Sequence, residues 1–339
     1  MVDSSLLAFV LIVILAIGFA IVNGFNDAAN AIAPAIGTRA LSPRNALIIA
    51  AIANLAGACT GTAVAYTIGK GILIPEAVTN ATIIAALASI IVWGTLATLA
   101  GLPISLTHGF VAALAAAGAA VAGSDAVRWD IFLRVLSAVV SAPLLGFIGG
   151  FVAMVILFWL LRRGAPSKIM SVFNRLQLLS SAFSAYAHGK NDGQMPIGII
   201  VIALVAFSQD ASLWDRLSIT DPQMWWVIIV PAVAISAGTA MGGWRVIETM
   251  GMKVTSLNPV QGFTAQAAAA AVIEGASNLG IPVSTTHCIT SSVMGVGATK
   301  RFSAVRWGIA GNIVAAWILT FPICGALGYF FSWLLHLWA

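Results

Sequence analysis

The chain has 339 residues, of which 60% are hydrophobic and only 8% are charged, and its mean hydropathy is +1.01. A soluble domain carries about 25% charged residues, so this composition excludes a water-exposed surface over most of the molecule. The formal net charge of +5 comes from basic residues at the ends of apolar stretches, which indicates membrane topology rather than nucleic-acid binding.

Apolar stretches of membrane-spanning length follow one another along the chain. A spanning helix needs about 20 apolar residues, and the continuous character of these stretches favours helices over a β-barrel. We therefore expect an all-α polytopic membrane protein with about 10–12 membrane segments, some of them broken or re-entrant. The stretches are 5–37, 46–68, 82–100, 102–123, 131–160, 177–207, 225–243, 262–280, 282–299 and 307–335.

Basic residues predict the orientation. The central segment 161–176 carries four of them. The other basic residues on which the orientation rests lie at the ends of apolar stretches, around 39–44, 245–253 and 300–306. Positive charge favours the cytoplasmic side, which leaves the loops 69–80, 124–130 and 208–222 and the N-terminus outside. We expect the cell inner membrane, no cleavable signal peptide, and no disulfide or zinc site from the odd number of cysteines.

Two motifs occur once in each half. Gly24–Asp27 resembles Gly189–Asp192, at an offset of 165 residues (192 − 27), and Leu102–His108 resembles Ile281–His287, at an offset of 179 (284 − 105). The predicted topology gives the halves opposite orientations, a pattern typical of secondary transporters. We expect a first inverted repeat at 1–160, a basic cytoplasmic loop at 161–176 and a second inverted repeat at 177–339.

The Asn-Asp pairs place Asp27 and Asp192 within apolar segments. Ionisable groups at membrane depth are costly and usually mark an ion pathway. The alternative for a single Asp is a helix cap at the membrane interface, but two matched pairs argue against it. A carboxylate near hydroxyl and carbonyl oxygens suits Na⁺, whereas a buried carboxyl that takes up a proton suits H⁺.

The two Pro-x-Ser-x-Thr-His motifs predict helix breaks, because Pro removes a backbone donor. A helix that restarts after the break would direct its N-terminal N–H groups at an anion. Hydroxyl groups would complete a neutral cradle for a tetrahedral oxyanion, although simple helix capping explains each motif equally well. These hydroxyls belong to Ser105, Thr107, Ser284, Thr285 and Thr286.

Several neighbouring residues have structural interpretations. We expect the imidazoles of His108 and His287 to bond to backbone carbonyls and hold the broken helices. We favour an outward, lipid-facing position for Lys190 over a cation beside the anion. Glycines of both motifs are expected at close helix contacts and helix breaks; they are Gly24, Gly101, Gly189 and Gly280.

These motifs resemble the inorganic phosphate transporter (PiT) family, most closely its bacterial low-affinity branch. The strongest stretches are 23–30, 38–44, 188–194 and 259–306, and the match covers nearly the whole chain. The resemblance implies two inverted repeats with broken helical hairpins, a homodimer in the lipid bilayer, and uptake of inorganic phosphate by symport with Na⁺ or H⁺. It implies neither a cofactor nor an enzymatic activity.

The resemblance also assigns roles to residues. Phosphate would be lined by Asn26, Ser105, Thr107, Asn191, Ser284, Thr285 and Thr286. Asp27 and Asp192 would hold the coupling cation, as metal ligands if it is Na⁺. Auxiliary roles fall to Asn23, Asn30, Gln266 and Glu274.

The chain departs from the family pattern at two places. Leu106 stands where relatives commonly have Ser or Thr, which removes a donor from the first half-site. Gln266 stands where many relatives have Glu, and Glu274 follows about two helical turns later. Our hypothesis is that Glu274 partly replaces the missing acid.

Three alternative functions remain open at this point. A sulfate permease on the same fold would bind an anion that only accepts hydrogen bonds, whereas phosphate also donates, so the acceptors of the Asn-Asp pairs favour phosphate. An anion channel would not need carboxylates that repel its ion. A membrane enzyme lacks support because no nucleophile–base pair or metal cluster has the required spacing.

Overall fold

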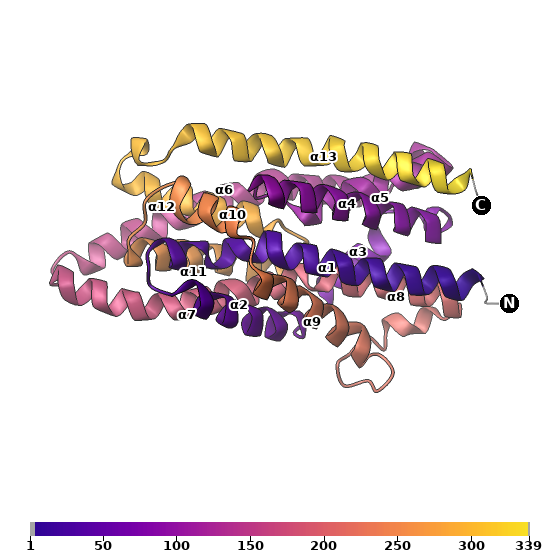
Figure 1. Ribbon diagram of the computed structural model, residues 1–339, viewed down its shortest axis with the longest axis horizontal. Coiled ribbons are helices and arrows are strands. Elements are labelled where there is room, and N and C mark those ends of the chain that lie inside the picture. Colours follow the sequence, from indigo (N-terminus) through magenta and orange to yellow (C-terminus); the bar gives the residue numbers. More distant parts are fainter. Residues whose placement is uncertain (1–3, 338–339) are drawn as a thin grey trace.

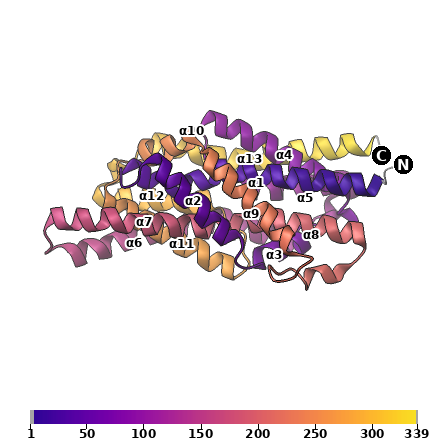
Figure 2. The ribbon, with the colours of Figure 1, turned by 60° about the horizontal axis from the view of Figure 1, so that its bottom comes forward.

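The computed structural model describes residues 4–337. Its regular elements are helices, apart from an isolated bridge between Leu73 and Val127. Both termini lie at one end of the elongated molecule and the turn between α6 and α7 lies at the other, in both views (Figures 1 and 2). The long apolar helices are α1 (Ser4–Gly37), α4 (Asn80–Ala100), α6 (Trp129–Leu161), α13 (Trp307–His336) and the near-continuous pair α7 (Pro166–Asp192) and α8 (Gln194–Ser208).

Two further apolar segments are bent rather than straight. The axis turns by 71° between α2 (Pro43–Ala58) and α3 (Ala63–Gly71). It turns by 63° between α9 (Trp225–Met241) and the segment formed by α10 (Trp244–Glu248) and the π-helical turn Thr249–Lys253. Among the residues that the structure describes, five long helices, or up to seven spans if each bent pair counts once, are apolar enough to cross a membrane, so the chain is a multi-pass membrane protein.

Two regions of the chain each form a helical hairpin with an extended tip. The first hairpin joins α4 to α5 (Leu106–Ala122), and the second joins α11 (Pro259–Asn278) to α12 (Thr285–Lys300). Each tip turns at a glycine with positive φ, Gly101 at 72° and Gly280 at 67°, a conformation that only glycine adopts without strain.

The elements recur in the same order in both halves. α4 and α11 begin 179 residues apart (259 − 80), and so do α5 and α12 (285 − 106). The capping boxes that open α4 and α11 keep this offset, with Thr79 and Asn258 as the N-cap residues. The recurrence is consistent with two repeats, while their inversion across a membrane stays a prediction.

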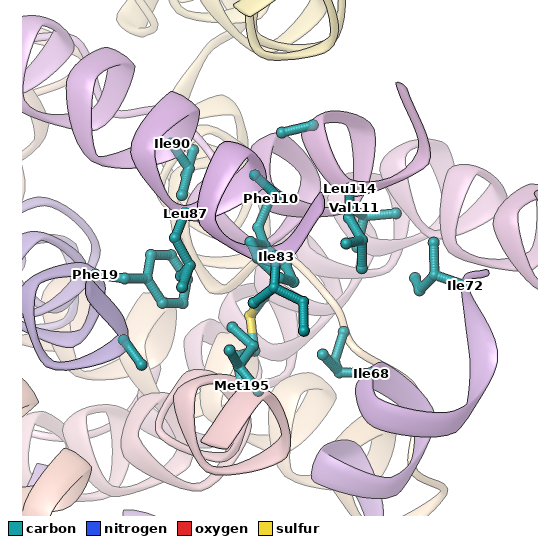
Figure 3. Close-up of a cluster of buried hydrophobic side chains, with 14 of the residues drawn as sticks. Phe19, Ile68, Ile72, Ile83, Leu87, Ile90, Phe110, Val111, Leu114 and Met195 are labelled. Carbon is teal, nitrogen blue, oxygen red and sulfur yellow. The ribbon is translucent and has the colours of Figure 1, made fainter. Parts of the chain in front are cut away.

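The hairpins interlock the two halves. α5 packs against α13, the last helix of the second half, and α12 packs against α6, the last helix of the first. A large apolar cluster between α1, α4, α5 and α8 packs against the first hairpin. Its fully buried side chains include Phe19, Leu87, Phe110 and Met195 (Figure 3), so the hairpin tip is held against the centre of the molecule.

The predicted loop at 161–176 is wrong in its extent. Only Arg162–Ala165 lies outside helices, because Pro166 starts α7 at its first turn, a position that proline tolerates well. The basic residues Lys168 and Arg175 are therefore helical. A cluster of polar and basic residues indicated a loop, but here it marks the exposed start of a helix.

Candidate functional site

The two aspartates of the Asn-Asp pairs meet at the centre of the molecule. Asp27 lies within α1 and Asp192 ends α7. The side-chain amide of Asn23 donates to both carboxylates, at 3.1 Å from Asp192 Oδ2 and 3.4 Å from Asp27 Oδ2. All three side chains are buried, so the structure brings the predicted acidic groups of both halves into one network.

Hydroxyl groups from the tip of the second hairpin complete this network. Thr286 Oγ1 donates to Asp27 Oδ1 at 2.8 Å, and Thr285 Oγ1 donates to Asp192 Oδ2 at 3.3 Å. The amide of Asn30 donates to Thr286 Oγ1 at 2.8 Å. The start of α12 therefore lies directly over the carboxylates.

The asparagines beside the two aspartates take matching positions against the hairpins. The Asn26 amide donates to Thr98 Oγ1 at 2.6 Å, near the end of α4. The Asn191 amide lies 2.9 Å from Ser277 Oγ, near the end of α11. Thr98 and Ser277 are 179 residues apart (277 − 98), so each asparagine ties its own half to its own hairpin. With its amide oriented so that the oxygen accepts from Ser277, Asn191 also donates to Asp192 Oδ1 at 3.2 Å and to the Val283 carbonyl at 3.0 Å.

Ser105 and Ser284 are N-cap residues. Their hydroxyl oxygens accept from the backbone N–H of His108 at 3.2 Å and of His287 at 3.1 Å, which leaves each O–H free to donate. Thr107 Oγ1 is buried without a hydrogen-bond partner among the described residues. Leu106, the departure from the family pattern, is fully buried and fills the space opposite Gly94.

His188 belongs to the site although its motif position gave no such indication. Its Nδ1 lies 2.7 Å from Asn54 Oδ1, and its Nε2 lies 3.4 Å from Asp192 Oδ2. The Asn54 amide nitrogen donates to Thr239 Oγ1, whose own proton goes to the Ile235 carbonyl. Asn54 Oδ1 therefore faces the histidine, and His188 Nδ1 carries the proton.

When the imidazole is neutral, this proton assignment leaves two acceptors facing each other. A neutral His188 presents the lone pair of Nε2 to the Asp192 carboxylate, and Nε2 has no hydrogen-bond partner among the described residues. Ligand atoms of Asp27, His188 and Asp192 lie within 4.8 Å of one another. Since two acceptors at 3.4 Å repel unless a cation or proton lies between them, the geometry fits a small cation.

The site is closed and rich in acceptors. Its asparagines and the hairpin-tip threonines Thr107, Thr285 and Thr286 are at most 1% exposed. The side-chain oxygens of Asn23, Asn26 and Asn30 are buried without a donor among the described residues. Unpaired buried acceptors are costly, so the arrangement favours occupants that bring positive charge or hydrogen-bond donors.

The expectation that the two motif histidines bond to backbone carbonyls is wrong. The ring nitrogens of both His108 and His287 lack a hydrogen-bond partner among the described residues. The two rings instead lie against each other, with 5.2 Å between centroids, and His108 also stacks on Phe321. The pair therefore joins the starts of α5 and α12 by ring packing.

The expectation for Lys190 is also wrong. Its side chain is only 12% exposed and forms an ion pair with Glu274, and Nζ also donates to Asn278 at 2.7 Å. The sequence showed a basic residue in an apolar helix, but not that α11 covers this face of α7.

Gln266 lies elsewhere on α11. Its amide nitrogen donates to the Ala31 carbonyl at 2.7 Å and to Ser181 Oγ at 2.8 Å, and its oxygen accepts from Ser180 at 3.0 Å. Glu274 thus shares none of the hydrogen-bond partners of Gln266. Neither residue contacts the carboxylate network directly.

Comparisons with known proteins agree with the motif resemblance. A model described as the phosphate transporter family matches residues 23–170 and 162–328. A probable low-affinity inorganic phosphate transporter of Rhizobium meliloti (strain 1021) is 42% identical, covering 94% of this chain and 95% of the relative. The corresponding Bacillus subtilis (strain 168) protein is 38% identical, covering 96% of each. A solved structure described as the sodium-dependent phosphate transporter matches with a TM-score of 0.87 at 27% identity, covering 97% of this chain and 99% of that one.

Proposed function

We propose that this chain, which belongs to the phosphate transporter family, carries inorganic phosphate across its membrane by symport with Na⁺. Membership of the family makes the chain a multi-pass membrane transporter of phosphate and not an enzyme. The choice of Na⁺, the residues that bind each ion and the transport cycle are the parts that we propose.

The observation that carries the choice of Na⁺ is the meeting of unpaired acceptors at the carboxylates. Asp27, Asp192 and the hydroxyls of Thr285 and Thr286 supply the oxygen ligands that hard cations prefer. His188 directs Nε2 toward Asp192, and in the neutral imidazole this nitrogen adds a further acceptor. The printed description of the solved relative as sodium-dependent supports the same ion.

Phosphate is assigned to the two hairpin tips, where α5 and α12 start. A helix start offers N–H groups and the positive end of the helix dipole to an anion. The hydroxyls of Ser105, Ser284 and Thr107 are free to donate. The unpaired oxygens of the asparagines accept the proton of hydrogen phosphate, which sulfate does not offer.

Neutral ligands also suit a transporter that must release its substrate. No lysine or arginine contacts the carboxylate network in the described residues, and Lys190 is engaged by Glu274. The cations bound at Asp27 and Asp192 then supply the positive charge that phosphate needs. Phosphate and Na⁺ would therefore bind together and leave together.

We assign the transport cycle to alternating access by two inverted repeats. Burial of the site on all sides supports an occluded intermediate. The N-terminus is assigned to the outside and the α6–α7 turn to the cytoplasm of a cell inner membrane, and they lie at opposite ends of the molecule (Figure 1). A homodimer is assigned from the family resemblance alone.

The test is uptake of radiolabelled phosphate into proteoliposomes under an inward Na⁺ gradient and, separately, an inward H⁺ gradient. Accumulation above equilibrium with Na⁺ alone is the expected result. Accumulation with H⁺ alone would mean that the carboxylates bind the coupled proton instead of Na⁺. Sulfate uptake in place of phosphate would overturn the substrate, and uptake that never exceeds equilibrium would indicate a channel.

A further inference from the structure

A groove runs between α6, the second hairpin and, at one end, α3, away from the carboxylate site. It consists of two cavities of about 330 and 370 Å³ that share the lining residues Arg134, Leu279 and Ile281. α6 and α11 pack beside each other along it. The groove is therefore an elongated space on a membrane-spanning surface rather than a pocket in a soluble region.

The groove has one charged residue in its lining. Arg134 lies in the second turn of α6, is exposed, and forms no ion pair with any described residue. Asp130, one turn earlier, makes its contact with Arg128 at 4.0 Å. Ser137 and Ser141 of α6 line the groove beyond Arg134, and Tyr66 and Thr67 of α3 line its other part, so Arg134 lies between two polar stretches of the lining.

The facing wall is apolar and open. It is formed by Ala271, Val272, Gly275 and Ala276 of α11 and by the hairpin tip at Leu279 and Ile281. A Cβ atom added at Gly275 would meet no atom within 4 Å. Leu279 is 77% exposed. An unfilled apolar groove between membrane helices needs an apolar occupant.

We propose that this groove binds one glycerophospholipid with an anionic head group. An acyl chain would fill the apolar part along α11, and the head-group phosphate would pair with the guanidinium of Arg134, a geometry that arginine favours. The charge of Arg134 and the lipid surroundings of the helices select this occupant over a soluble ligand. The lipid would press against Leu279 and Ile281, on the tip that leads to Ser284.

Lipid binding is measured by native mass spectrometry of the delipidated full-length protein in detergent, titrated with phosphatidylglycerol or phosphatidylcholine. The wild type is expected to bind one phosphatidylglycerol in preference to phosphatidylcholine. R134Q should weaken phosphatidylglycerol binding roughly tenfold and abolish the preference. R128Q, which removes an arginine already paired with Asp130, is the matched control and should keep it.

A second pair of variants tests the apolar wall. Gly275→Leu should abolish binding of both lipids, whereas Gly311→Leu, at an equally open glycine on α13, should not. Equal loss in R128Q and R134Q would overturn the proposal in favour of general surface charge. Conversion of a dimer to a monomer by Gly275→Leu in mass photometry would also overturn it, because a second copy of the chain would then cover the groove.

Discussion

Thr286 donates a 2.8 Å hydrogen bond to Asp27, although the two residues are 259 positions apart in the sequence. The contact joins the hydroxyl motif of the second half to the Asn-Asp motif of the first. Asn30 donates to the same hydroxyl oxygen, so the proton of Thr286 is committed to the carboxylate. Residues that the sequence presents as two separate half-sites therefore act on one another directly.

Replacing Thr286 with Val should weaken the binding of the coupling ion. The change removes a donor to a buried carboxylate, worth about 1.5–3 kcal/mol, and we expect the Na⁺ concentration for half-maximal phosphate uptake to rise roughly tenfold or more. Thr299→Val is the control, since Thr299 bonds only to the Val296 carbonyl within α12. Thr286→Ser should restore most of the affinity. Equal effects of the Thr286 and Thr299 variants would contradict the assignment.

Asp192→Asn should abolish coupled uptake without unfolding the protein. The new amide can donate a hydrogen bond to His188 Nε2, which lies 3.4 Å from the present carboxylate oxygen. This hydrogen bond would occupy the acceptor that a bound cation contacts in the wild type. We expect uptake to fall at least about 30-fold, corresponding to about 2 kcal/mol, with an unchanged circular dichroism spectrum. Asp125→Asn, in the short helix before α6, is the control. Wild-type uptake by Asp192→Asn would remove this residue from the ion site.

The Lys190–Glu274 ion pair should matter for stability. Glu274→Gln leaves a mostly buried ammonium without its oppositely charged partner, which costs more than removing both charges. We expect Glu274→Gln to lower the unfolding temperature in detergent by several degrees, and Lys190→Met combined with Glu274→Leu to lie closer to the wild type. A double variant less stable than Glu274→Gln would contradict this account of the pair.

The same variant tests the hypothesis that Glu274 replaces the acid missing at Gln266. If it does, phosphate uptake by Glu274→Gln should change its dependence on pH. The measurement is initial uptake between pH 5.5 and 8.5 at fixed Na⁺ in wild type and variant, compared at equal amounts of folded protein. Superimposable pH profiles would leave Glu274 as the structural partner of Lys190 only.

Gly189→Ala should disrupt the site by preventing the close packing of α7 against α2. A Cβ at this position would lie 2.2 Å from the Asn54 carbonyl oxygen, so α7 would have to move away from α2. This shift would break the Asn54–His188 hydrogen bond, and we expect lower thermal stability together with loss of uptake. Gly311→Ala, with open space around it, should change neither property. Wild-type uptake by Gly189→Ala would show that this close approach is dispensable.

The repeated motifs made much of the site predictable. Asp27, Asp192, Thr285 and Thr286 were identified because ionisable and hydroxyl residues are rare in apolar segments, and the structure joins them. The expectation of close packing at the motif glycines is confirmed at Gly189, whose neighbour is a backbone carbonyl. Local composition and repetition were sufficient for these residues.

Other parts depended on tertiary packing that a single sequence does not carry. Asn54 belongs to neither motif, so its role in fixing the proton of His188 follows only from the approach of α2 to α7. Lys190 was assigned to the lipid face because a helix pattern does not say which neighbour covers each side. His108 was given a carbonyl partner, since the ring packing of two hairpin starts lies outside any local rule.

The most direct test of the central claim, that phosphate and Na⁺ share one site built from both halves, is the linkage between their affinities. Isothermal titration calorimetry of the purified protein would give the phosphate dissociation constant at a series of Na⁺ concentrations, with choline keeping the ionic strength constant. The account predicts a dissociation constant that falls steadily as Na⁺ rises, and a loss of this dependence in Asp192→Asn. A phosphate affinity that is the same with and without Na⁺ would contradict it.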